Sequence, residues 1–197
     1  ADIHGSLDKI KKIKSVISRE SPDIIVIAGD ITNYFSYLKT LNRLRDILIP
    51  IFAIRGNSDL KRIEGKLKNQ HNTTLLSSEP NIFQDIIFLG LNGTIPLPFL
   101  SKVGFRETKI FRRLNPHVTP ETILVVHPPP RGICDKVGNT FNAGSFRLRK
   151  FIEEHSPKMV LCGHIHEQAG YQFFNKNTLV VNCAMNKKYS GAIIDYG

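Results

Sequence analysis

One hexapeptide constrains this chain most: Leu161-Cys162-Gly163-His164-Ile165-His166. The apolar run Met159–Cys162 predicts a buried β-strand that ends at the glycine. Because alternate side chains share one face of extended backbone, His164 and His166 are expected to point into one cavity beyond the strand end. For an isolated pair, the alternative is one histidine packed in a turn and the other in solvent.

Carboxylate, amide and imidazole side chains also follow other apolar runs. They are those of Asp2, His4, Asp30, Asn57 and His127. Their presence favours the interpretation that His164 and His166 point into one cavity. An open α/β sheet places its site at the carboxyl ends of its strands, which is where this pattern puts these side chains.

The first half of the chain alternates strands and helices. Apolar spacing predicts a helix over Ser6–Glu20 with Ser6 as N-cap, and a second over Tyr34–Leu48 along Leu38, Leu41, Leu44 and Leu48. Buried strands are expected at Ile24–Ala28 and Ile51–Ile54, which gives a βαβ pattern with mostly parallel strands. Since an aspartate at a strand end should follow a strand, Asp2 predicts a short apolar strand upstream of Ala1.

The second half is less regular. We expect a short helix near Leu60–Leu67, then a hairpin of Ile82–Phe83 with Ile86–Leu89. A strand at Thr122–Val126 and a helix over Ser145–His155, capped by Ser145, are expected to follow. Short antiparallel strands are expected at Tyr171–Phe174, Leu179–Val181 and Ala192–Ile194. Gly93–Gly104 is expected to form a loop over the site, and Lys109–Leu114 a helical turn. With no repeat or linker, residues 1–197 are predicted to form a single domain.

Composition restricts the class of protein. The 197 residues are 41% hydrophobic, and no apolar run approaches the roughly 18 residues of a membrane span, so no membrane partner is expected. Three scattered cysteines fit small core residues in a reducing, cytoplasmic protein. The net charge of +10 suits either a nucleic-acid or phosphate partner or a generally basic surface. Nothing in the sequence indicates the oligomeric state.

The seven candidate metal ligands are Asp2, His4, Asp30, Asn57, His127, His164 and His166. Oxygen and imidazole donors together suit Mn²⁺, Fe or Zn²⁺ better than Ca²⁺ or a thiolate-bound metal. Asp30 ends a long buried strand and is the expected bridge between two ions. Two cations about 3.5–4 Å apart can clamp a phosphoryl group and lower the pKa of a bridging water toward hydroxide.

Five blocks in this order resemble the calcineurin-like metallophosphoesterase superfamily: Asp2-x-His4, Gly29-Asp30, Gly56-Asn57-x-Asp59, His127 and Gly163-His164-x-His166. The resemblance covers essentially the whole chain and is nearest to small single-domain archaeal and bacterial phosphodiesterases. It implies an α/β fold, a four-layer α/β/β/α sandwich of two mixed sheets, whose first strand is missing from the numbered chain.

The resemblance also implies two divalent metal ions, with Mn²⁺ favoured and Fe, Zn²⁺, Ni²⁺ or Mg²⁺ as alternatives. One ion would be held by Asp2, His4, Asp30 and His166, and the other by Asp30, Asn57, His127 and His164. The implied activity is that of a phosphodiesterase in which a metal-bound hydroxide attacks phosphorus in a small phosphoester. Asp30, Asn57 and His127 would then be catalytic as well as ligating.

Three further residues are of interest. Many family members place a histidine directly after the asparagine, but this chain has Ser58, which cannot act as a proton donor near neutral pH. Asp59 is a candidate catalytic residue that orients Asn57 or the site backbone, with a helix N-cap as the alternative. Arg131 follows a stretch of prolines after His127 and is a candidate phosphate contact, with a simple exposed arginine as the alternative.

Two other function classes stay open. The positive charge is compatible with a nuclease on DNA or RNA, although such relatives usually carry added domains. A non-catalytic protein-binding scaffold with this fold is the other alternative, and the retention of all seven ligand positions argues against it.

Overall fold

The computed structural model describes residues 1–33, 37–93, 111–138, 140–188 and 190–196, and contains two main sheets. The smaller sheet is parallel, in the order β1 (Ile25–Ala28), β2 (Ile51–Ile54) and β3 (Thr73–Leu75). Short β-branched and aromatic runs form these strands, and β2 is buried throughout. The predicted βαβ pattern is therefore confirmed for the first half of the chain.

The larger sheet has six strands in the order β10-β11-β9-β6-β5-β4. Its strands are β4 (Asn81–Phe83), β5 (Ile86–Gly90), β6 (Ile123–Val125), β9 (Met159–Cys162), β10 (Gly170–Phe174) and β11 (Thr178–Asn182). The four central strands are parallel, and the two edge strands are antiparallel to their neighbours. A separate hairpin of β7 (Lys136–Val137) and β8 (Phe141–Asn142) was not predicted.

The helices with both ends in the described ranges are α1 (Leu7–Glu20), α2 (Tyr37–Arg45), α3 (Ile63–Lys68), α5 (Phe146–His155) and the 3₁₀ helix η1 (His166–Gln168). Residues 111–114 are helical as well. Both predicted N-caps are confirmed, because Ser6 Oγ accepts from Lys9 N and Ser145 Oγ accepts from Leu148 N. These caps satisfy donors that the first helical turn leaves unpaired.

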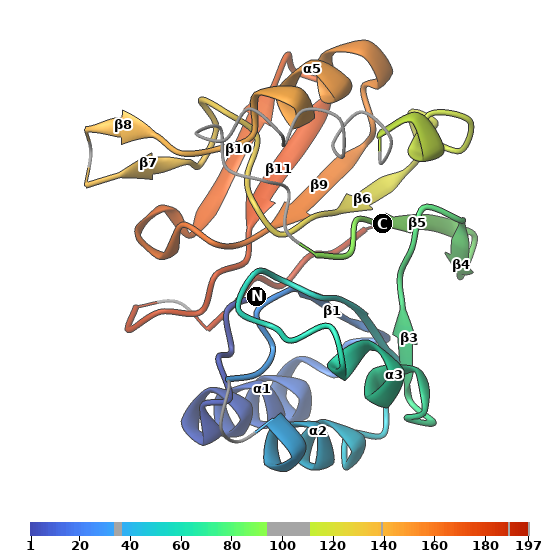
Figure 1. Ribbon diagram of the computed structural model, residues 1–197, viewed down its shortest axis with the longest axis vertical. Helices are drawn as coiled ribbons and strands as arrows, with labels where there is room; N and C mark the ends of the chain where they lie inside the picture. Colours follow the sequence, from blue (N-terminus) through green and yellow to red (C-terminus); the bar gives the residue numbers. More distant parts are fainter. Residues whose placement is uncertain (34–36, 94–110, 139, 189, 197) are drawn as a thin grey trace.

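Figure 1 shows α1, α2 and α3 on one side of the molecule, α5 on the other and the two sheets between them. Three hydrophobic clusters pack successive layers together. The first lies between α1–α3 and the smaller sheet, and includes Ile10, Leu44 and Ile51. The second fills the space between the two sheets and includes Phe52 and Leu161. The third joins the larger sheet to α5, and its members include Leu124, Leu148, Phe151 and Val160. Helices therefore cover the outer face of each sheet, which agrees with the predicted fold class.

Two predictions about elements are wrong. The second helix ends at Arg45, so Leu48 is 93% exposed, and Leu38 is 52% exposed on the outer face of the helix. Ile47 enters the core instead of Leu48. No strand forms at Ala192–Ile194. The predicted antiparallel arrangement is confirmed for β10 and β11, and the other edge of β11 pairs in parallel with β9.

Other predictions fall partly outside the described residues: residues 34–36 of the second helix, most of the Gly93–Gly104 loop, and Lys109 and Ile110. None of the helices in the described ranges is long and apolar enough to cross a bilayer.

The start of the chain lies between the end of β1 and residues 183–185. Asp2 N donates to Gly29 O at 3.1 Å, and Met185 N donates to Ala1 O at 3.1 Å. Among the described strands, β1 pairs only with β2. Beside its other edge lies an apolar cavity of about 220 Å³, whose walls include Ile25, Ile27, Met159 and residues 190–194.

Candidate metal centre

The predicted ligands gather at the carboxyl ends of parallel strands from both sheets. Asp30 follows β1, His127 follows β6, and His164 and His166 follow β9. Asp2 and His4 lie in the turn before α1, and hydrogen bonds from Asp2 N to Gly29 O and from His4 N to Asp30 O hold that turn beside β1. The site is therefore assembled from segments far apart in the sequence.

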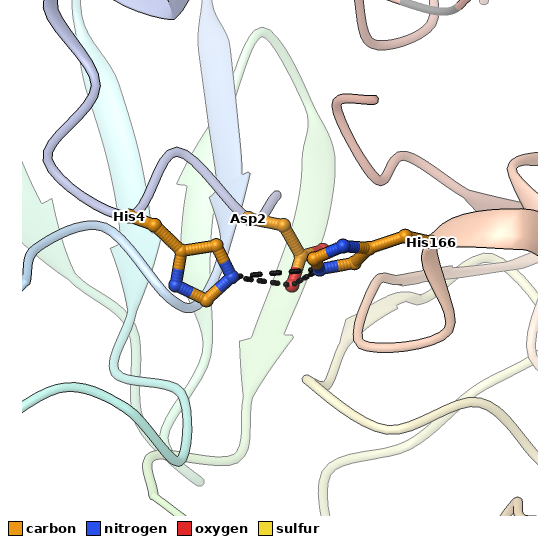
Figure 2. Close-up of side chains that lie close together, drawn as sticks. All are labelled: Asp2, His4 and His166. Carbon is orange, nitrogen blue, oxygen red and sulfur yellow. Dashed lines mark hydrogen bonds and ion pairs between the residues drawn. The ribbon is translucent and has the colours of Figure 1, made fainter. Parts of the chain in front are cut away.

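A first ligand group consists of Asp2, His4 and His166, which point toward one another in Figure 2. Asp2 Oδ1 lies 3.1 Å from His166 Nε2 and 3.7 Å from His4 Nε2. The two Nε2 atoms are themselves only 3.4 Å apart. One cation between them can contact all three side chains, since the candidate ligand atoms lie within 4.8 Å of one another.

A second ligand group consists of Asp2, Asp30 and His127, all buried. His127 Nδ1 is 2.9 Å from Ala28 O, and its N–H donates to that carbonyl, so the Nε2 atom is the one left to bind a cation. Asp30 Oδ2 lies 3.3 Å from His127 Nε2 and 3.7 Å from His4 Nε2. Asp30 thus faces both groups, as a bridging carboxylate must.

Two buried atoms of the site have no hydrogen-bond partner among the described residues: Asp2 Oδ1 and His127 Nε2. Asp2 and His127 are 0% and 1% exposed. Buried polar atoms are nearly always paired, so two unpaired atoms that both offer a lone pair in one cluster fit a bound cation. The residues present therefore fit the implied metals.

The remaining two predicted ligands lie at the margin of this cluster. The ring of His164 packs edge-on against the ring of His127 at 5.1 Å, while its main-chain N–H donates to Asp2 Oδ2. Asn57 is exposed, and its Nδ2 donates to Ser58 Oγ at 3.4 Å.

Four residues of the site have strained backbone conformations. Asp2, His4, Asp30 and His164 all have φ between 51° and 71°, the left-handed region that side chains other than glycine rarely adopt. Each such residue costs about 1–3 kcal/mol, and such residues cluster at functional sites. Glycine allows the close approach of the segments, because a Cβ at Gly163 would clash with the carboxylate of Asp2.

The charges of Asp30 and His127 support each other. Burial opposes ionisation of Asp30, but the close approach of His127 and two hydrogen bonds from Ser58 outweigh it and hold the pKa of Asp30 well below its usual range. Burial also disfavours a charged His127, but Asp30 outweighs it and raises the pKa of His127. Burial lowers the pKa values of His4 and His164.

Comparison with known proteins decides the family. A family model described as calcineurin-like phosphoesterase matches residues 1–168. The chain belongs to this family. Membership and the candidate ligand groups support a metal-dependent phosphoester hydrolase.

Similar proteins extend the comparison. The UPF0046 protein K07C11.7 of Caenorhabditis elegans is 36% identical over 66 residues, which is 34% of this chain and 22% of that protein. The chain thus spans about a fifth of that curated relative.

Solved structures share the fold at low identity. TT1561 of Thermus thermophilus superposes with a TM-score of 0.66 at 16% identity, covering 93% of this chain and 86% of that one. A structure described as a novel archaeal phosphodiesterase has a TM-score of 0.54 at 17% identity, covering 93% and 79%. Phosphopantetheinyl hydrolase of Mycobacterium tuberculosis has a TM-score of 0.61 at 11% identity, covering 85% and 79%.

Within this calcineurin-like site, Asp59 lies behind the ligands. Its buried carboxylate accepts hydrogen bonds from Ile31 N, Thr32 N, Thr32 Oγ1 and Gly56 N, at 2.8–3.0 Å. It thereby joins the loop after β1 to the loop after β2. We assign it a role in positioning the backbone, because all its hydrogen bonds stay within these loops.

Arg131 faces a different neighbour from the one predicted. Its Nη1 donates to Asn142 O in β8 at 2.8 Å, so its hydrogen bond supports the β7–β8 hairpin. A contact between Arg131 and phosphate stays a prediction.

Two contacts of the site were not predicted. Lys9 Nζ donates to Asp2 O from the first turn of α1, and Ser58 donates twice to Asp30. Lys9 follows the N-cap by three residues, which was a signal that it lies over the preceding turn. Nothing local to Ser58 indicated a contact 28 positions away.

Proposed function

We propose that this chain is a phosphodiesterase that uses two divalent cations, with Mn²⁺ favoured, on small phosphoester substrates. The observation that carries this proposal is the pair of ligand groups that share Asp2, with Asp30 close to both. The archaeal phosphodiesterase with the same fold supports a diester substrate. The cluster between the two sheets supports a single domain over residues 1–197, and three free thiols support a cytoplasmic location.

Asp2, His4, Asp30 and His166 would hold one cation, and Asp30, Asn57, His127 and His164 the other. Bound cations would polarise the phosphoryl group and activate water. The chain's own residues supply orientation: Ala28 O fixes the His127 ring, and Ser58 and the loops joined by Asp59 fix the Asp30 carboxylate.

Metal-dependent hydrolysis tests the proposal. Metal-stripped protein should be inactive on bis-(p-nitrophenyl) phosphate and regain activity with Mn²⁺, and it should cleave p-nitrophenyl phosphate more slowly. Asp30→Ala should lose both metals by elemental analysis after dialysis, whereas His127→Ala should lose mainly one. Unchanged occupancy in Asp30→Ala would refute the bridging role.

A nuclease is the second candidate, favoured by the net charge of +10. Electrostatic binding to nucleic acid falls steeply with salt. A gel shift with single-stranded DNA that weakens from about 50 to about 200 mM salt, together with Mn²⁺-dependent cleavage, would favour the nuclease. A scaffold would differ from both enzymes by retaining no metal after dialysis.

A further inference from the structure

Ser58 holds both oxygens of the buried Asp30 carboxylate. Its main-chain N–H donates to Asp30 Oδ1 at 2.8 Å, and its hydroxyl donates to Asp30 Oδ2 at 2.8 Å. Asp30 is 2% exposed, whereas Ser58 is exposed at the mouth of the site. Two donors on two oxygens fix the rotation of a carboxylate that a single hydrogen bond would leave free to turn.

The hydroxyl acts on the oxygen that faces both ligand groups. Asp30 Oδ2 is the atom that lies 3.3 Å from His127 Nε2 and 3.7 Å from His4 Nε2. A rotation of this carboxylate would move Oδ2 away from both histidines at once.

The same hydroxyl also contacts Asn57. Asn57 Nδ2 lies 3.4 Å from Ser58 Oγ, so the hydroxyl accepts from the amide while it donates to Asp30. Because the amide nitrogen is turned toward Ser58, the amide oxygen is the end left to bind a cation. One serine therefore orients two of the proposed ligands.

We propose that Ser58 is a positioning residue that sets the orientation of Asp30 and Asn57 and thereby the affinity of the site for divalent cations. This inference rests on the proposed metal site. The hydroxyl has no comparable role in holding the loops, because Asp59 already joins their backbones from within the core.

Removal of the hydroxyl alone tests the proposal. Ser58→Ala keeps the main-chain donor but loses the bond to Oδ2, and should weaken Mn²⁺ binding by about 10- to 100-fold in calorimetric titration, the usual effect of losing a partner that orients a ligand. Ser58→Thr keeps a hydroxyl at an exposed position, and should bind Mn²⁺ almost as tightly as the unmodified chain. The electron paramagnetic resonance spectrum of bound Mn²⁺ should change in Ser58→Ala and not in Ser58→Thr.

Ser145→Ala is the matched control. It removes a serine hydroxyl that accepts from Leu148 N at the start of α5, so it should lower the melting temperature without changing Mn²⁺ affinity. Equal Mn²⁺ affinity and spectra in Ser58→Ala and the unmodified chain would overturn the positioning role. Mn²⁺ binding without hydrolysis by the unmodified chain would instead count against the proposed phosphodiesterase alone.

Discussion

His127 differs from its neighbouring histidines in how tightly the metal-free site holds a proton. Asp30 raises the pKa of His127 against the effect of burial, while burial lowers the pKa values of His4 and His164. A cation binds only the neutral imidazole, so His127 must lose its proton when the metal binds. Apparent metal affinity should therefore fall as the pH drops through the raised pKa of His127.

Proton release measures this directly. Below the raised pKa of His127, Mn²⁺ binding should release a proton from this histidine, detected with a pH indicator or by calorimetry in buffers of different ionisation enthalpy. His127→Asn should release fewer protons than the unmodified chain, whereas His164→Asn should release about as many. Equal proton release from His127→Asn and His164→Asn would mean that the released proton does not come from His127.

The rate on substrates with poor leaving groups is expected to depend on residue 58, which lies in the loop after β2. Without an imidazole at position 58, alkyl phosphate esters should react far more slowly than aryl phosphodiesters, because general-acid help is worth about 10²–10⁴-fold. At saturating Mn²⁺, Ser58→His should raise the rate on poor leaving groups more than on good ones. Equal, shallow slopes of log rate against leaving-group pKa in both proteins would mean that another residue supplies the proton.

The clustering of Asp30, His127 and His166 could be predicted from the sequence, because each lies just after an apolar strand and the carboxyl ends of parallel strands converge. Their role as metal ligands stays a prediction. The contacts of Ser58, Asp59 and Arg131 could not be predicted in this way. Each depends on a loop-to-loop distance set by the packing of separate elements. For Asp59, the partners lie 27 and 28 positions away as well as nearby.

At the level of elements, the end of α2 is set by a side chain from the segment before β3. Asn72 Nδ2 donates to Leu44 O at 3.0 Å and to Ile47 O at 2.7 Å. Leu44 O also accepts from Ile47 N at 3.1 Å, so the contact with Ile47 O is the one for which Asn72 supplies the partner where the helix stops.

Asn72→Ala should therefore destabilise the protein by about 1–3 kcal/mol, the cost of leaving such groups unpaired. For a chain of this size that corresponds to a melting temperature lower by about 2–4 °C per kcal/mol. Asn81→Ala is the control, because the half-buried Asn81 side chain donates to Glu79 O two positions away and caps no helix. An equal loss of stability in both variants would mean that the Asn72 hydrogen bonds at the end of α2 stabilise the protein no more than the Asn81 hydrogen bond does.

Periodicity predicted α1 and α5 well because each has a serine cap and an apolar stripe. It failed for Leu48 because no local signal marked the cap supplied by Asn72. It failed for Ala192–Ile194 because an apolar run specifies burial or exposure without specifying a partner strand, and these residues line the cavity beside β1 instead.

For the molecule as a whole, that cavity bears on the expected strand before Ala1. Its apolar walls and the unpaired edge of β1 would suit an extended apolar segment joined to Ala1. A chain with six apolar, β-forming residues added before Ala1 should melt at a higher temperature than the 197-residue chain. An extension of six Gly and Ser residues is the control, and equal melting temperatures would show that no strand forms there.

The ligands of the first group come from distant parts of the chain, since His4 and His166 are 162 positions apart in sequence. Contacts of such long range form late in folding, because bringing together residues so far apart in sequence requires the closure of a very long chain loop. The metal cannot serve as an early folding template here, because no short segment contains a complete ligand set. Cation uptake during refolding should therefore coincide with the last kinetic phase, and a bound metal identifies a molecule in which both sheets have already docked.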